Sequence, residues 1–193
     1  MTYDPRTYWD SRARRQGASY VGPMGEDDRA QFDQFAGTLR AFVQPYGKPH
    51  TLMDFGCGSG RFAKLLAGLA TWYMGVDIST VGLSYTQLPL NGAFMHLRTD
   101  GIPLGDNSVD AVVAVTVFQH IVDEEEFQGW AGEIARVLRP GGAVVVIDEV
   151  RKLEQYPEHM NPRSPRIVGA ALGLPPVDTK LVPGTGHWAA RFL

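Results

Sequence analysis

The stretch Thr51-Leu-Met-Asp-Phe-Gly-Cys-Gly-Ser-Gly-Arg61 decides the fold of this chain. Its first five residues are mostly apolar, which predicts a buried strand, and glycines then alternate at positions 56, 58 and 60. Glycine has no Cβ, so a ligand can approach the backbone of such a loop closely. A helical pattern follows directly. The stretch therefore predicts a strand, a ligand-binding turn and a helix in succession.

Strand and helix patterns alternate along the chain as far as position 149. The predicted strands cover residues 51–55, 72–76, 94–98, 110–117 and 143–147. The predicted helices cover residues 32–43, 62–69, 79–88 and 123–138. We expect Pro140-Gly-Gly142 to form the turn that ends the last helix. This alternation predicts a mostly parallel sheet with helices on both faces.

The C-terminal part has a different pattern. Ser164-Pro165 predicts the start of a short helix that runs through Leu172. Two further stretches, 177–182 and 187–193, flank a Gly/Pro-rich turn and predict a hairpin. We expect one domain over 1–193, made of an N-terminal helical part (1–49), a core of alternating strands and helices (50–150) and a C-terminal part with the hairpin (151–193).

The composition excludes several classes of protein. The chain has 193 residues, 44% of them hydrophobic and 20% charged, as in an ordinary globular domain. A net charge of −3 gives no positive field for nucleic acid, and we interpret Arg12, Arg14 and Arg15 as a solvated helix face. The single cysteine, Cys57, cannot form an internal disulfide, and no signal peptide or apolar run of membrane-spanning length is present. We therefore expect a cytoplasmic protein that does not bind a membrane.

Residues able to bind or react follow the predicted strands. Asp77 closes the second strand, about twenty residues beyond the glycines, and Asp100 follows the third. Residues 116–120 follow the fourth. In an open parallel sheet, ligands bind beyond the carboxyl ends of the strands, so we expect these groups to surround one site.

The spacing within the glycine loop narrows the choice of ligand class. A dinucleotide loop would place its third glycine at position 61, where this chain has Arg61. The Gly-Lys-Ser/Thr of a phosphate-binding Walker loop is also missing. Asp77 stands where a carboxylate binds ribose hydroxyls. The ligand is therefore expected to carry a ribose but to need no diphosphate cradle.

Four motifs in this order resemble the class I S-adenosylmethionine-dependent methyltransferases over about residues 51–148. They are Met53-Asp-Phe-Gly-Cys-Gly-Ser-Gly60, Gly75-Val-Asp-Ile-Ser79, the segment from Asp100 to Asp110 with Phe118-Gln-His-Ile121, and Leu138-Arg-Pro-Gly-Gly142. The resemblance implies a Rossmann-like, doubly wound α/β fold. Its mostly parallel seven-stranded sheet would have an antiparallel C-terminal strand, in a three-layer α/β/α sandwich.

The resemblance also implies the cofactor S-adenosyl-L-methionine, with S-adenosyl-L-homocysteine as the product. Asp77 would hold the ribose, Ile78 would pack on adenine, and Asp100 would accept from the adenine amino group. Ile78 as plain core and Asp100 as a turn former remain open alternatives. The cofactor residues so implied are Tyr8, Asp54, Gly56, Cys57, Gly58, Asp77, Ile78, Asp100, Gly101, Thr116 and Val117.

The stretch Tyr8-Trp9-Asp10-Ser-Arg12, in an N-terminal segment that also holds Tyr3 and Tyr20, resembles the family's lid over the cofactor, with ordinary core packing as the alternative. Residues 1–49 would then be the lid and cap, 50–150 the cofactor-binding core and 151–193 the substrate segment.

Two residues are candidates for catalysis. His120 lies in a motif position where the family often has histidine, with a structural hydrogen bond as its alternative role. Glu149, just past the fifth strand, is expected to face the pocket as a substrate contact. Asp123 and the acidic run 124–126 predict a helix start rather than a metal site, so we expect no metal.

The predicted reaction is methyl transfer to an oxygen or nitrogen atom of a small molecule. A nucleic-acid methyltransferase is less favoured, because Thr116-Val-Phe-Gln119 replaces the Asn/Asp-Pro-Pro motif of base amino-methylation. A protein acceptor and a non-catalytic S-adenosylmethionine-binding module are further alternatives. We expect a monomer or homodimer with a small-molecule methyl acceptor.

Overall fold

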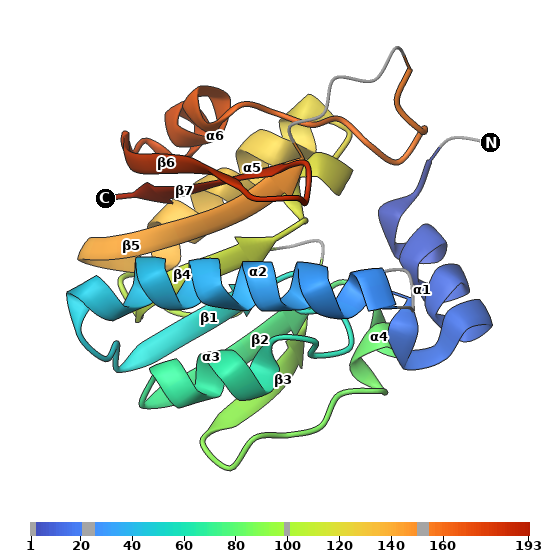
Figure 1. Cartoon of the computed structure of the whole chain (residues 1–193), viewed down its shortest axis with the longest axis horizontal. Helices are drawn as coiled ribbons and strands as arrows, with labels where there is room; N and C mark the ends of the chain where they lie inside the picture. The colour runs from blue at the N-terminus through green and yellow to red at the C-terminus, as the bar shows by residue number, and fades with distance from the viewer. Residues whose placement is uncertain (1–2, 21–25, 99–100, 150–154) are drawn as a thin grey trace.

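The computed structural model describes residues 3–20, 26–98, 101–149 and 155–193 (Figure 1). The helices are α1 (Pro5–Gln16), α2 (Glu26–Val43), α3 (Ala63–Leu69), α4 (Thr80–Leu83), α5 (Glu124–Val137) and α6 (Pro165–Leu172), with a short 3-10 turn η3 (Phe118–His120). The strands are β1 (Thr51–Phe55), β2 (Trp72–Asp77), β3 (Gly92–His96), β4 (Val109–Val115), β5 (Leu138–Glu149), β6 (Pro176–Val182) and β7 (His187–Phe192).

The seven strands form one sheet in the order β3-β2-β1-β4-β5-β7-β6. The five strands from β3 to β5 are parallel, and β7 runs antiparallel to both of its neighbours. Strand order reverses beside β1, so the carboxyl ends of β1 and β4 flank the switch point where ligands bind in such sheets. The doubly wound sheet and its reversed last strand confirm the predicted fold class.

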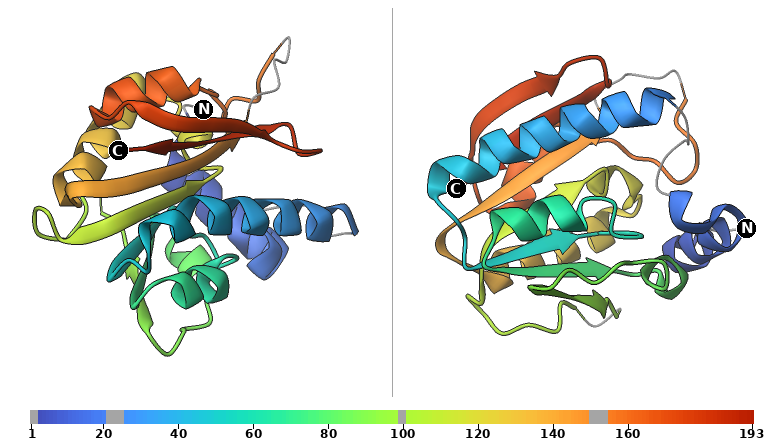
Figure 2. Two further views of the ribbon diagram at one scale, coloured as in Figure 1. Left: turned by 60° about the vertical axis from the view of Figure 1, so that its left-hand side comes forward. Right: turned by 60° about the horizontal axis from the view of Figure 1, so that its bottom comes forward.

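Helices cover both faces of the sheet (Figure 2). Successive side chains of a strand point to opposite faces, so Leu52 packs in the core under α2 and α3. Its neighbour Met53 packs in the core under α5 and α6. Both side chains are fully buried. A strand buried on both faces reads as a continuous apolar run, as the sequence of β4 does.

The start of α5 is capped as predicted. The side chain of Asp123 accepts a hydrogen bond from the Glu126 amide at 2.8 Å, which satisfies one of the free N–H groups of the first turn. The Glu126 carboxylate does not return to this cap; it accepts from the Trp130 indole at 3.4 Å. The helix therefore presents a carboxylate toward the carboxyl edge of the sheet.

Several boundaries differ from the prediction, and α2, for example, begins at Glu26, six residues before the predicted start. The stretch Leu138–Gly142, expected as a turn, is the beginning of β5, because Leu138 pairs with Val109 across the sheet. The helix predicted over 79–88 is reduced to the four residues of α4. Strand β3 begins at Gly92, two residues before the predicted start. Each boundary depends on pairing with a distant strand or on packing, which local patterns do not record.

Helix α1 lies across the carboxyl ends of the strands, beside α4 (Figure 1). It begins at Asp4, whose side chain accepts from the Arg6 amide, with Pro5 in the first turn. Asp10 attaches it to the core, because Oδ1 of Asp10 accepts from the Ser79 hydroxyl at 2.6 Å and from the Val81 amide at 3.2 Å. The N-terminal segment is thus docked over the predicted site.

Candidate functional site

A pocket opens at the carboxyl edge of the sheet and encloses about 1030 Å³ of space, its open mouth included. Its walls come from the ends of β1, β2 and β4, from α1 and from α5. They bring together nine of the predicted site residues: Asp54, Gly56, Cys57, Gly58, Asp77, Ile78, Thr116, Val117 and His120. Segments far apart in the sequence therefore meet at one site, as their positions at strand ends predict.

The glycine loop forms the floor of this pocket. Gly56, Gly58 and Gly60 all have positive φ angles, of 72°, 57° and 78°. At Gly56 a Cβ would lie 2.5 and 2.8 Å from the two methyl carbons of Val117. Glycine at position 56 is therefore required both by the backbone conformation and by close packing. The loop leaves backbone exposed where a ligand can approach.

Asp77 ends β2 and holds the loop in place. Its Oδ2 accepts from the Gly58 amide at 2.8 Å, and its Oδ1 accepts from the Ser79 amide at 2.7 Å. Burial raises the pKa of Asp77 to about 6, while these two hydrogen bonds act in the opposite direction. Each carboxylate oxygen retains a second lone pair for a ligand hydroxyl.

Asp54 lies deeper, at the end of β1. Its Oδ2 accepts from the Tyr73 hydroxyl at 2.9 Å, and only 3% of the residue is exposed. Burial raises the pKa of Asp54 to about 7, with the Tyr73 hydrogen bond partly offsetting the effect. Asp54 lines the pocket from below the loop. Burial also raises the pKa of the nearby Cys57 thiol, which disfavours its thiolate form.

Thr116 terminates β4 in an unusual conformation. Its φ is +55°, which is a strained value for a β-branched residue, and its amide donates to the Ile147 carbonyl at 2.6 Å. The turn directs residues 116 and 117 into the pocket wall. On the other side, Ile78 and Leu97 supply an apolar wall. Such a slot between apolar side chains suits a flat aromatic group.

His120 is a neutral imidazole held at both nitrogens. The Gln119 side-chain oxygen accepts from the Glu149 amide at 2.7 Å, which turns the Gln119 amide nitrogen toward Nε2 of His120 at 3.2 Å. Nδ1 lies 2.9 Å from the His159 carbonyl and therefore carries the proton. Burial lowers the pKa of His120 to about 4.

Trp9 and Tyr8 are neighbours in α1 but lie differently relative to the pocket. Trp9 lines the pocket, with its ring 4.9 Å from that of His120. Tyr8 is stacked on the His159 ring at 4.7 Å and is not among the described residues that line the pocket.

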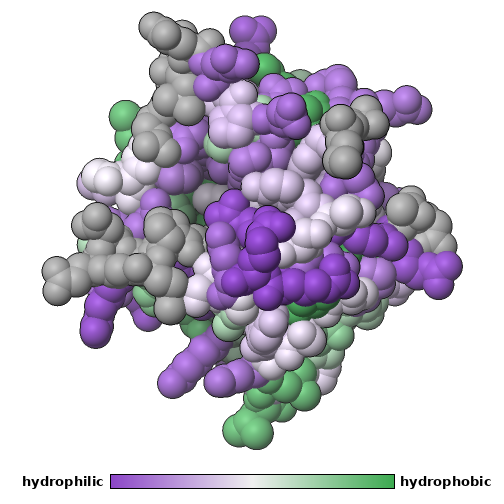
Figure 3. Space-filling model, turned by 90° about the vertical axis from the view of Figure 1, so that its right-hand side faces the viewer, coloured by the Kyte–Doolittle hydropathy of each residue, from purple (hydrophilic) through white to green (hydrophobic). Residues whose placement is uncertain are grey.

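Figure 3 shows the side of the molecule where α1 lies. Hydrophilic atoms cover the middle of this face, and apolar atoms gather at its lower edge. The helix thus presents a polar outer surface and an aromatic inner one.

The two acids that end β5 lie apart from the pocket. Asp148 is fully buried and accepts from the Gln119 amide at 3.0 Å, and burial raises its pKa well above the ordinary value. Glu149 is 4% exposed, and its Oε2 lies 4.0 Å from Nε2 of His187. Neither is among the described residues that line the pocket. The expected orientation of Glu149 toward the pocket is therefore not seen in this structure.

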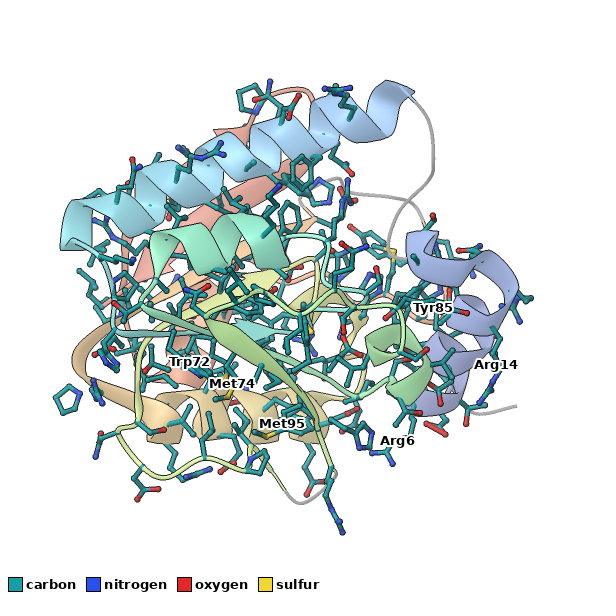
Figure 4. The ribbon with its side chains drawn as sticks, turned by 90° about the horizontal axis from the view of Figure 1, so that it is seen from below. Arg6, Arg14, Trp72, Met74, Tyr85 and Met95 are labelled. Carbon is teal, nitrogen blue, oxygen red and sulfur yellow. The ribbon has the colours of Figure 1, made fainter. Side chains whose placement is uncertain are left out.

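The predicted adenine-amino contact is only partly described. Asp100 lies outside the described residues. Gly101 has a φ of +119° and packs against the Glu133 carboxylate, apart from the pocket wall. Figure 4 views this underside of the sheet, with Met95 of β3 and Arg6 of α1 labelled.

Several wall residues had not been predicted as ligand contacts. They are Pro5, Trp9, Tyr20, Phe55, Arg61, Phe62, Leu97, Val115, Ile121, Glu126 and Trp130. Trp9 lies in the stretch that resembles a lid over the cofactor, and Tyr20 lies in the same N-terminal aromatic segment. The spacing of Glu126 fits a helix cap and that of Trp130 fits a core position, so the sequence pattern does not indicate a ligand contact at either.

The described residues hold neither a cluster of metal ligands nor a helix able to cross a membrane. Three or more His, Cys, Asp or Glu side chains do not gather in a group that could hold a metal ion anywhere in residues 3–20, 26–98, 101–149 and 155–193. Over the same ranges, all helices are too short or too polar to cross a membrane.

The chain is similar to known methyltransferases. A model of the methyltransferase domain family matches residues 53–146. A probable S-adenosylmethionine-dependent methyltransferase of Mycolicibacterium smegmatis is 34% identical over 100 residues, which are 49% of this chain and 36% of that protein. An O-methyltransferase of Penicillium expansum is 26% identical over 172 residues, 82% of this chain and 53% of that protein. This chain thus spans about a third to a half of the length of these relatives.

The fold has solved counterparts. The N-methyltransferase NodS of Bradyrhizobium japonicum, crystallised with S-adenosyl-L-homocysteine, superposes with a TM-score of 0.76 at 16% identity, over 98% of both chains. A methyltransferase of Aquifex aeolicus described as SAM-dependent gives a TM-score of 0.67 at 20% identity, over 99% of this chain and 98% of that one. At such identities the likeness concerns the fold.

Proposed function

We propose that this chain is a class I S-adenosylmethionine-dependent methyltransferase, as its match to the methyltransferase domain family over residues 53–146 indicates, and that it transfers a methyl group from S-adenosylmethionine to an oxygen or nitrogen atom of a small molecule. The observation that carries the proposal is the hydrogen bond from the Gly58 amide to Asp77. It holds the glycine loop beside the Asp77 carboxylate, which would bind the ribose, in the wall of one pocket. This is the arrangement that a nucleoside without a diphosphate needs.

The lining of the pocket supports one proposed orientation of the cofactor. The methionine part would lie over the bare backbone at Gly56, where a Cβ has no room. The ribose would lie at Asp77, and the adenine would enter the apolar slot beside Ile78 and Leu97. Thr116 would line the methionyl end. Asp54 would orient the loop from below rather than contact the cofactor directly.

The bound cofactor would supply an activated methyl group on a sulfonium. The protein would then mainly need to align the acceptor atom with that methyl group and to exclude water. Trp9 of α1 and Ile121 after η3 close the pocket from outside, which would keep water from the reacting atoms. The acceptor would enter from the side of Trp9 and His120. The docked N-terminal helix would therefore act as the lid.

His120 would position the acceptor, and Glu149 would remain a more distant candidate. Because both His120 nitrogens have partners, the imidazole can take a proton only if the Gln119 amide turns away from Nε2. His120 as a general base and Glu149 as a substrate contact stay predictions. Glu149 would reach an acceptor only through movement of the elements around the pocket.

The names of two similar proteins are in keeping with transfer to an oxygen or nitrogen atom. The Penicillium expansum relative is named an O-methyltransferase, and the structural neighbour NodS is an N-methyltransferase. The described part of this chain is close to the bare sheet and its helices, with a net charge of −3 for the whole chain. An enzyme that acts on nucleic acid would be expected to have a positive surface. The net negative charge of this chain therefore favours an uncharged or basic small molecule as the acceptor.

The test is turnover. Purified protein with S-adenosylmethionine should form S-adenosylhomocysteine when a panel of small phenols, alcohols and amines is supplied, and should remain inactive with duplex DNA, RNA or denatured protein. Product that forms only with a macromolecule would overturn the proposed acceptor class. Tight cofactor binding without turnover on either panel would favour the non-catalytic binding module.

A further inference from the structure

Tyr20 lines the pocket and carries a buried hydroxyl that packs toward Gly82 of α4. Only 2% of the residue is exposed, and its Oη meets no described group in good hydrogen-bond geometry, although the Ser79 side chain lies near it. Buried hydroxyls almost always have a partner, and leaving one without costs free energy. A group that is buried, without a well-formed hydrogen bond and in contact with the pocket is placed to bind a ligand.

The phenol is held rigidly, so its position is determined by the fold. The Tyr20 carbonyl accepts from Nε of Arg12 at 2.9 Å, and its amide donates to the Gly17 carbonyl at 3.2 Å. The ring lies 6.2 Å from that of Trp9. A Cβ at Gly82 of α4 would collide with the Tyr20 hydroxyl. Glycine at position 82 therefore makes room for this phenol.

The surroundings of the hydroxyl indicate which part of the cofactor it faces. Burial raises the pKa of Tyr20 far above its usual value, and its hydroxyl lies near the Asp77 and Asp10 carboxylates, Cys57 of the glycine loop and the Ser79 side chain. The Ser79 hydroxyl itself donates to Asp10 and accepts from the Gly82 amide. Because of its raised pKa, the Tyr20 hydroxyl stays protonated and acts as a donor. Asp10 already accepts from Ser79 and Val81. We therefore expect the Tyr20 hydroxyl to bind the ribose that is proposed to lie at Asp77.

We propose that Tyr20 is a cofactor-binding residue whose hydroxyl donates a hydrogen bond to the ribose hydroxyl that Asp77 accepts from. The inference rests on the proposed placement of S-adenosylmethionine and adds a ligand that comes from the N-terminal segment. A ribose hydroxyl both accepts and donates, so Tyr20 and Asp77 can bind it at the same time, and each hydrogen bond strengthens the other.

This contact links the lid to the cofactor. Asp10 attaches α1 to α4, and Tyr20 at the end of the same segment would attach it to the ribose. The labelled Arg14 of α1 and Tyr85 near α4 show how closely these two segments approach (Figure 4). The N-terminal segment would be stabilised over the pocket when the ribose is present.

The test compares variants and ligands by calorimetry. Tyr20→Phe should weaken binding of S-adenosylhomocysteine about five- to tenfold, the usual effect of one neutral hydrogen bond. The loss should disappear for either the 2′-deoxy or the 3′-deoxy analogue of S-adenosylhomocysteine, whichever lacks the contacted hydroxyl. The control is Tyr85→Phe, because Tyr85 is 39% exposed, and it should bind all three ligands like the wild type.

A second measurement separates ligand binding from folding. Since Tyr20→Phe removes a buried hydroxyl without a well-formed hydrogen bond in the free protein, its melting temperature should equal or exceed that of the wild type, by up to about 2–4 °C. A lower melting temperature would mean that the hydroxyl has a structural partner and would overturn the inference. Gly82→Ala, which displaces the phenol, should repeat the binding loss.

The outcomes also distinguish the inference from the proposed function. Wild-type protein that does not bind S-adenosylhomocysteine contradicts the cofactor site itself. Wild-type binding with an unchanged Tyr20→Phe variant contradicts only the role of Tyr20. An equal loss with the parent ligand and both deoxy analogues would place the hydroxyl on another part of the cofactor and overturn the ribose assignment.

Discussion

The Asp77 carboxylate and the Gly58 amide are joined by a hydrogen bond of 2.8 Å between residues 19 positions apart in the chain. It connects the end of β2 to the loop after β1, the two segments between which the cofactor is proposed to bind. Because the other oxygen of Asp77 accepts from Ser79, the carboxylate fixes the loop and the start of α4 together. Changes to this arrangement should affect binding before they affect the fold.

The glycine loop gives a matched pair of substitutions. Gly56→Ala should lower the affinity for S-adenosylhomocysteine at least tenfold and lower the free energy of unfolding by about 1–2 kcal/mol or more. Both effects follow from the positive φ of Gly56 and its contact with Val117. Gly68→Ala, in α3 with open space around it, should stabilise by about 0.5–1 kcal/mol and bind normally. Calorimetry and urea unfolding measure both. Wild-type affinity in Gly56→Ala would remove the loop from the site.

The buried Asp54 predicts a pH dependence of stability. Its pKa is raised from 3.8 to about 7 in the folded protein. A carboxyl with a raised folded pKa contributes stability below its unfolded pKa, and this contribution is lost as the pH rises through the folded value. Stability of the wild type should therefore fall between about pH 4 and pH 8 through this group.

The substitution Asp54→Asn tests this directly. The variant cannot ionise and keeps an oxygen to accept from Tyr73, so its free energy of unfolding relative to the wild type should rise by up to about 4 kcal/mol across that pH range. Urea unfolding at several pH values measures it, with the exposed Asp33→Asn as the control. A difference between variant and wild type that stays constant with pH would show that Asp54 is not titrating there.

His120 predicts the shape of the pH–rate profile. With a pKa near 4 and both nitrogens engaged, His120 is neutral above about pH 5.5, so its titration should add no limb to the profile of kcat/KM between about pH 5.5 and pH 8. His120→Asn should lower kcat less than about 100-fold and leave the profile unchanged in shape. A limb near neutral pH that disappears in His120→Asn would instead make His120 the general base.

The sequence predicted the parts of the molecule that depend on local chemistry. The loop glycines, Asp77 and the apolar run of β4 are each specified by what one residue type can do, such as adopting a positive φ or ending a buried strand. The short helix at 165–172 and the final hairpin follow from Pro, Gly and apolar spacing in the same way. These elements were placed within a few residues.

Features that depend on distant partners were not predicted. Leu138 belongs to β5 because it pairs with Val109, and no local pattern shows that pairing. The site role of Tyr20 follows from its buried hydroxyl and its contact with Gly82, neither of which is visible in the sequence. The position of Glu149 beside His187 follows from the register of β5 and β7. Packing decides such details, and packing is known only once the chain is folded.

The central claim is tested most directly by calorimetric titration of S-adenosylhomocysteine into the wild type and into Asp77→Ala, with NADH as the competing ligand. The account predicts one site per chain in the wild type, a loss of at least about tenfold in affinity in Asp77→Ala, as expected for hydrogen bonds to a charged group, and no binding of NADH. Equal affinity in the two proteins, or binding of NADH in place of S-adenosylhomocysteine, would contradict it.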